Sequence, residues 1–144
     1  MKEFISQKQD TTCCAVAIYN ACLHLEMEAP CLDTLIKRLC CDKGSSIGTD
    51  DVVKEIFGNR MVRKKPSNNS ELNKYFKEFL KVGGMTSINH PIFNLHYVLC
   101  LPHEDRSYMI NSWLGPNVMS IDGVEIFHFL PHRNNQVFWI FTGK

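Results

Sequence analysis

The sequence has 144 residues, of which 44% are apolar and 22% are charged, and its formal net charge is +1. This composition is typical of a globular protein, and the length predicts a single domain, residues 1–144, that can bury a core. So small a net charge gives no bulk attraction to nucleic acid or to a membrane surface. No apolar run approaches the roughly 18 to 20 residues of a membrane span, and the first residues are too polar for a signal peptide. We therefore predict a cytoplasmic protein with neither a nucleic-acid nor a membrane partner; the oligomeric state is not determined by the sequence.

The first half of the chain has helical periodicity. Apolar side chains recur at helical spacing, and Gly, Pro or Asn ends each run. Three predicted helices span about 12–28, 32–42 and 49–57. A fourth begins near Ser70, where Ser70 and Asn73 together mark its start, and stops at Gly83. The first of them is apolar on nearly every side, which is typical of a helix in the middle of a domain.

From Met85 onward the pattern becomes extended. Strands are predicted at 85–88, 95–101, 108–113, 118–121 and 137–142, with a further short strand at 60–65, while 127–130 fits either a strand or a helix. Helices followed by strands indicate an α+β fold, in which the N-terminal helices, including a buried central one, pack on a C-terminal antiparallel sheet.

Seven cysteines are present, an odd number that includes two adjacent pairs. Adjacent cysteines do not readily bridge in regular structure, so we expect reduced thiols. The chain lacks the Cys-x-x-Cys spacing of common zinc sites, and we predict neither a bound metal nor another cofactor. Most of these thiols are interpreted as small core residues, namely Cys22, Cys31, Cys40, Cys41 and Cys100.

Cys13 stands out because it lies at the predicted start of the apolar helix. Thr12 is the candidate N-cap, which makes Cys13 the first helical residue. The positive end of the helix dipole and unpaired backbone N–H groups favour the thiolate there. Cys13 is therefore the candidate nucleophile.

Two later strands supply candidate partners for this thiol. His96 carries the imidazole of the apolar strand at 95–101, and Asn111 is the conspicuous polar residue of the next strand. A hairpin with Leu101 opposite Tyr108 would set Asn111 opposite Val98, two residues from His96. In this register His96 and Asn111 share one face on diagonal positions.

A thiol, an imidazole and an orienting amide are the parts of a cysteine nucleophile system. The imidazole accepts the thiol proton, the amide fixes the ring, and a further donor stabilises the oxyanion. Gln7, six residues before Cys13, is the candidate for that donor.

Basic residues Arg60, Arg63, Lys64 and Lys65 form a cluster without interleaved aromatic residues, which favours a solvated face over a nucleic-acid site.

These motifs resemble those of the papain-like cysteine peptidases: Gln-x5-Cys before an apolar helix, then a His-aromatic-Val-Leu strand and an Asn-Ser-Trp strand. The segment from Thr12 to Ala21 is closer still to the compact double-glycine leader (bacteriocin-processing) peptidases. The resemblance implies Gln7 as the oxyanion-hole residue, Cys13 as the nucleophile, His96 as the base and Asn111 as the orienting residue, with Trp113 shielding the last two. The implied function is that of a cysteine protease acting on a protein or peptide substrate.

The sequence departs from that family at two positions. Cys14 stands where the family usually has Gly, and Gln9 with Cys14 gives a second, shorter spacing for the nucleophile. Asn111 replaces the aspartate that is usual in leader peptidases. The sequence does not choose between hydrolysis and deamidation, transglutamination or isopeptide cleavage, and a binding or inhibitory module on the same fold is a further alternative.

Overall fold

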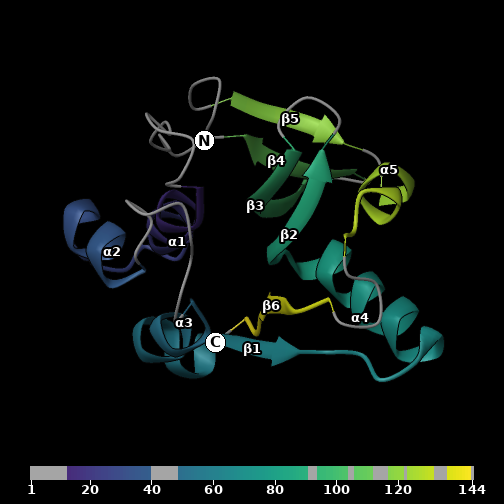
Figure 1. Ribbon diagram of the computed structural model, residues 1–144, viewed down its shortest axis with the longest axis horizontal. Coiled ribbons are helices and arrows are strands. Elements are labelled where there is room, and N and C mark those ends of the chain that lie inside the picture. Colours follow the sequence, from purple (N-terminus) through teal and green to yellow (C-terminus); the bar gives the residue numbers. More distant parts are fainter. Residues whose placement is uncertain are drawn as a thin grey trace.

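A computed structural model of the chain describes residues 13–39, 49–90, 94–103, 106–111, 117–121, 123–131 and 136–143 (Figure 1). Its elements follow the order helices first and strands second. The helices are α1 (Cys13–His24), α2 (Leu32–Arg38), α3 (Thr49–Phe57), α4 (Asn69–Val82) and α5 (Gly123–His128), with a short 3-10 helix η2 (Gly58–Arg60) after α3. The strands are β1 (Met61–Lys64), β2 (Gly84–His90), β3 (Asn94–His103), β4 (Arg106–Asn111), β5 (Asn117–Ile121) and β6 (Phe138–Phe141).

The strands form one antiparallel sheet in the order β1-β6-β2-β3-β4-β5. Strands β2 to β5 are neighbours in sequence as well as in space, as expected of a meander of hairpins. The C-terminal β6 instead returns to the other edge of β2, where it also pairs with β1. Figure 1 shows β1 and β6 together on one side of the molecule and β4 and β5 on the other.

Helices cover both faces of this sheet. Helix α1 packs on β3 from one side, with α2 beside it and α3 near β1, whereas α4 and α5 lie on the opposite side (Figure 1). Alternate residues of β3 serve the two sides. Tyr97, Leu99 and Leu101 belong to the core under α1, and Val98 and Cys100 belong to the core under α4 and α5. The apolar sequence of this strand is thereby explained, since both of its faces are covered.

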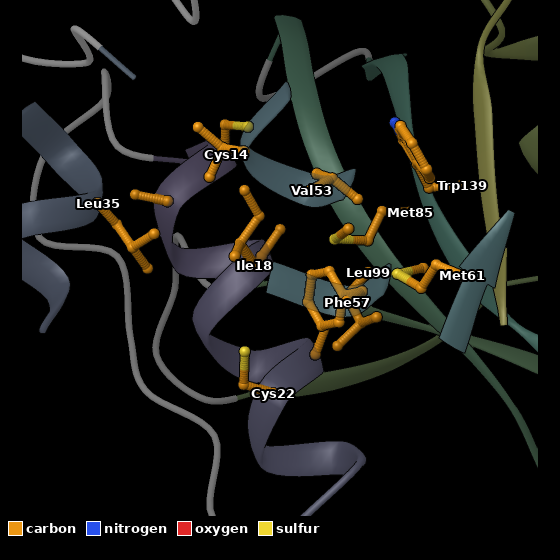
Figure 2. Close-up of a cluster of buried hydrophobic side chains, with 14 of the residues drawn as sticks. Cys14, Ile18, Cys22, Leu35, Val53, Phe57, Met61, Met85, Leu99 and Trp139 are labelled. Atoms are coloured by element: carbon orange, nitrogen blue, oxygen red, sulfur yellow. The ribbon is translucent and has the colours of Figure 1, made fainter. Parts of the chain in front are cut away.

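The core around α1 combines small and aliphatic side chains with the aromatic rings of Phe57, Trp139 and Phe141. Figure 2 shows Cys14, Ile18 and Cys22 along α1, with Leu35 of α2 on one side of the helix and Val53 and Phe57 of α3 near the strands on the other. Most of α1 is buried, as its composition predicted. A helix that is apolar on all sides requires such neighbours all around it.

Three helix boundaries differ from the prediction. Helix α2 ends at Arg38, with Leu39 as its C-cap, rather than near residue 42. Helix α1 ends at His24 rather than near residue 28, because Glu26 adopts a left-handed conformation with φ of 57°. The N–H of Met27 donates to the carbonyl of Cys22 and that of Glu26 to Leu23, a Schellman ending that normally uses Gly. Helix α4 begins before Ser70, because the side chain of Asn68 caps it by accepting from the N–H of Glu71 at 2.8 Å.

Other expectations are confirmed or corrected at single positions. Strand β1 confirms the short strand predicted near residue 60, and the ambiguous segment at 127–130 completes α5 and the turn after it. Cys22 and Cys100 are buried as expected, but Cys31 is exposed because it lies just before the first turn of α2. Cys40 and Cys41 lie outside the described residues.

Candidate active site

Helix α1 begins at Cys13, the residue predicted to open it. For this residue, and for His96 and Asn111, the structure describes the position of the backbone. The predicted N-cap Thr12, the oxyanion-hole candidate Gln7 and the shielding Trp113 lie outside the described residues. The site can therefore be built from the elements that carry it and from the side chains around the start of α1.

Cys14, the second of the two adjacent thiols, has 0% of its surface exposed. Its Sγ lies 3.6 Å from the Oγ1 of Thr49 at the start of α3, within hydrogen-bonding range for sulfur. A thiol enclosed in this way does not meet a substrate without rearrangement of the core. Burial thus argues against Cys14 as the nucleophile.

The hairpin that carries the other two candidates has the predicted register. Leu101 pairs with Tyr108, and the ladder continues through Leu99 opposite Ile110. One further step sets Asn111 level with Val98, two positions from His96, which itself pairs with Ile88 of β2. The backbone therefore places His96 and Asn111 at diagonal positions near the same end of neighbouring strands.

Successive residues of β3 alternate between the two faces of the sheet, which places position 96 on one of them. Position 96 falls on the same side of the sheet as Val98 and Cys100, which pack toward α4 and α5, while Tyr97 packs on the α1 side. His96 is the third residue of its strand. Position 96 therefore lies near one end of the strand, on the face of the sheet opposite the one that α1 covers.

Thr49, which contacts Cys14 near the start of α1, is followed in α3 by Asp50. The two carboxylate oxygens of Asp50 accept hydrogen bonds from the indole N–H of Trp139 and from the Nε of Arg63, both at 2.9 Å. Asp50 thereby joins the first turn of α3 to strands β6 and β1. A residue pattern gives no sign of contacts between segments that lie 89 and 13 residues apart.

The buried thiols of Cys22 and Cys100, which lie elsewhere in the protein, are expected to be unreactive. Burial raises the pKa of the Cys22 thiol to about 11 and that of the Cys100 thiol to about 12. A raised pKa keeps both groups in the thiol form, which is a weak nucleophile, at neutral pH. This agrees with their interpretation as core residues.

The basic cluster near β1 is partly engaged within the protein. Arg63 makes its ion pair with Asp50, and the Nζ of Lys64 lies 5.3 Å from the centre of the Tyr75 ring. Arg63 and Lys65 are exposed. These contacts account for two of the four cations without a nucleic-acid partner.

The described ranges contain no group of three or more His, Cys, Asp or Glu residues arranged to hold a metal ion. Within the same ranges no helix combines the length and the apolar character needed to cross a bilayer.

The arrangement of helices and sheet has counterparts among solved structures. It matches the peptidase domain of Streptococcus ComA, a bifunctional ABC transporter involved in quorum sensing, with a TM-score of 0.69 and 10% identity over 97% of this chain and 98% of that one. It also matches a double-glycine motif protease from an AMS/PCAT transporter, solved with its leader peptide, with a TM-score of 0.59 and 17% identity over 96% and 91% of the two chains. No protein-family model and no curated protein sequence matches. The predicted fold is confirmed: the chain has the papain-like α+β fold of these double-glycine peptidase domains.

Proposed function

We propose that the protein is a cysteine-dependent hydrolase that cleaves a peptide or amide bond, with Cys13 as the nucleophile. His96 is the proposed base, Asn111 orients it, and the side chain of Gln7 stabilises the oxyanion together with the backbone N–H of Cys13. The observation that carries the proposal is the start of the buried helix α1 at Cys13, within the fold of known peptidase domains.

The proposed reaction has two steps. His96 takes the proton of the Cys13 thiol, the sulfur attacks the carbonyl carbon, and the C–N bond breaks as His96 returns the proton to the leaving amine. A thioester to Cys13 remains. His96 then removes a proton from water, the hydroxide attacks the thioester, and the acid is released as the thiol is restored.

A peptide is the proposed substrate. One structural neighbour was solved in complex with a leader peptide, and both are peptidases by name. We place the reaction in the cytoplasm, because a thiol nucleophile and an exposed free thiol such as Cys31 both persist best in a reducing compartment.

Selective alkylation tests the proposal. The protein is treated with a limiting amount of iodoacetamide at pH 7, and the modified cysteines are located by mass spectrometry. Cys31 is an internal reference, since it is an exposed thiol on the same chain. An activated Cys13 should react about tenfold faster than Cys31, and the His96→Ala substitution should remove most of that advantage.

Hydrolysis is then read directly from a library of synthetic peptides. Cys13→Ala should abolish cleavage, whereas Cys31→Ser, which changes a thiol just outside α2, should preserve it. If Cys13 reacts no faster than Cys31 and no peptide is cleaved, the hydrolase proposal is wrong and the fold serves as a binding module.

A further inference from the structure

We infer that Thr49 and Cys14 are positioning residues, whose mutual contact fixes the start of α1 and thereby the place of Cys13. The inference rests on the proposed role of Cys13. It assigns to α3 a part in the site that the sequence pattern did not indicate. Three features support it: the position of the Cys14 sulfur, the position of the Thr49 hydroxyl and the packing of α1.

The first feature is the place of the sulfur. Cys14 follows Cys13 in the first turn of α1, and its side chain is wholly enclosed. Its Sγ lies 3.6 Å from the Oγ1 of Thr49, so one of the two groups donates to the other. This contact is directional and lies one residue from the proposed nucleophile.

The second feature is the place of the hydroxyl. Thr49 is the first residue of α3, and the next residue, Asp50, is held by Trp139 of β6 and Arg63 of β1. Trp139 is buried, and β6 pairs directly with β2, the neighbour of β3. The hydroxyl of Thr49 is therefore held in a defined position relative to the sheet that carries His96.

The third feature is the character of the helix itself. The side chains that α1 turns into the core are mostly apolar, from the small Ala15 and Ala21 to the larger Ile18. Apolar packing is non-directional, so it opposes rotation or sliding of such a helix less than a hydrogen bond does. Because reacting groups tolerate displacements of well under 1 Å, a contact that fixes the first turn affects the rate as well as the stability.

The test is a set of substitutions read by the alkylation rate of Cys13 relative to Cys31 in each protein. Thr49→Val replaces the hydroxyl with a methyl group of similar size and should lower this ratio by about threefold to tenfold. Thr49→Ser keeps the hydroxyl and should restore the wild-type ratio. The pH profile of the Cys13 alkylation rate should move to higher pH in Thr49→Val but not in Thr49→Ser.

A double-mutant cycle isolates the contact. Cys14→Ala should lower the ratio by about as much as Thr49→Val, and the double variant should lower it no further, because both remove the same interaction. Thr142→Val is the matched control, since it removes a hydroxyl that donates to the carbonyl of Asn59 at 2.7 Å, a hydrogen bond that includes no residue of α1. It should leave the ratio unchanged.

The outcomes separate this inference from the proposed function. If Cys13 is activated in the wild type but Thr49→Val reacts at the wild-type rate, the positioning role is wrong and the hydrolase proposal stands. Additive effects of Cys14→Ala and Thr49→Val would also overturn it, as would equal losses in the serine and valine variants. A wild-type Cys13 no more reactive than Cys31 would remove both.

Discussion

The two sides of the sheet differ in how their side chains pack. Both cores contain aromatic rings, but among the described residues buried alanines occur only under α1, whereas under α4 and α5 the phenylalanine rings contact one another. On the aromatic side Phe79 lies 5.4 Å from Phe138 and Phe76 lies 5.3 Å from Phe127, measured between ring centres. Small residues let a helix backbone approach a strand closely, while aromatic rings fill volume and bury large areas.

This difference suggests a division of labour between the sides. The aromatic side supplies much of the stability, because each ring removes a large apolar area from water. The α1 side sets the position of the segment that begins with Cys13, because the backbone of α1 lies close to β3. Stability and thiol reactivity should therefore respond to different substitutions.

The largest expected effect is on the aromatic side. Phe79 is fully buried between α4 and β6, and Phe79→Ala should lower the free energy of unfolding by about 3 to 5 kcal/mol, as measured by urea denaturation. At low temperature, where the variant is still folded, the alkylation rate of Cys13 relative to Cys31 should stay near the wild-type value. A fall in that ratio as large as in α1-side variants would contradict the division.

A smaller loss of stability with a larger loss of reactivity is expected under α1. Ala21 is fully buried in that core, and Ala21→Leu forces extra volume between the helix and its neighbours, at a cost of about 1 to 3 kcal/mol. The helix should shift, and the relative alkylation rate of Cys13 should fall. Asn73→Leu, at an exposed position of α4, is the matched control and should change neither quantity appreciably.

The smallest effect is a pH dependence from a buried thiol. Burial raises the pKa of Cys100 from 9.0 to about 12, so the folded state holds this proton more tightly than the unfolded state does. The stabilisation is fully present below pH 9 and is lost as the pH rises toward 12. Between pH 8 and pH 10 the free energy of unfolding should fall by about 1.4 kcal/mol on this account.

The measurement compares urea denaturation of the wild type and Cys100→Ala at the two pH values. The variant loses stability at both through its cavity, but its fall between them should be smaller by the contribution of the thiol. Parallel curves would mean that Cys100 can ionise inside the folded protein, and that this side of β3 is less tightly sealed than its packing indicates.

Much of the fold could be predicted from local signals. The apolar helix at Cys13, the strands from Met85 onward and the hairpin with Leu101 opposite Tyr108 follow from hydrophobic periodicity and from the even loop between two strands. Local signals were misleading where an unusual residue took a special role. Glu26 ends α1 in a left-handed conformation that favours glycine. Asn68, rather than Ser70, marks the start of α4 as its N-cap.

For the candidate site, the sequence by itself supplied the residues that are proposed to carry the chemistry, because a thiol at a helix start and an imidazole on a strand are local signals. Tertiary structure alone decided that β6 lies between β1 and β2, that Cys14 is enclosed against Thr49, and that Asp50 joins Trp139 to Arg63. These contacts join residues 13 to 89 positions apart, and their geometry depends on how the helices pack on the sheet. Periodicity and spacing report only on neighbours along the chain, so they leave such contacts undetermined.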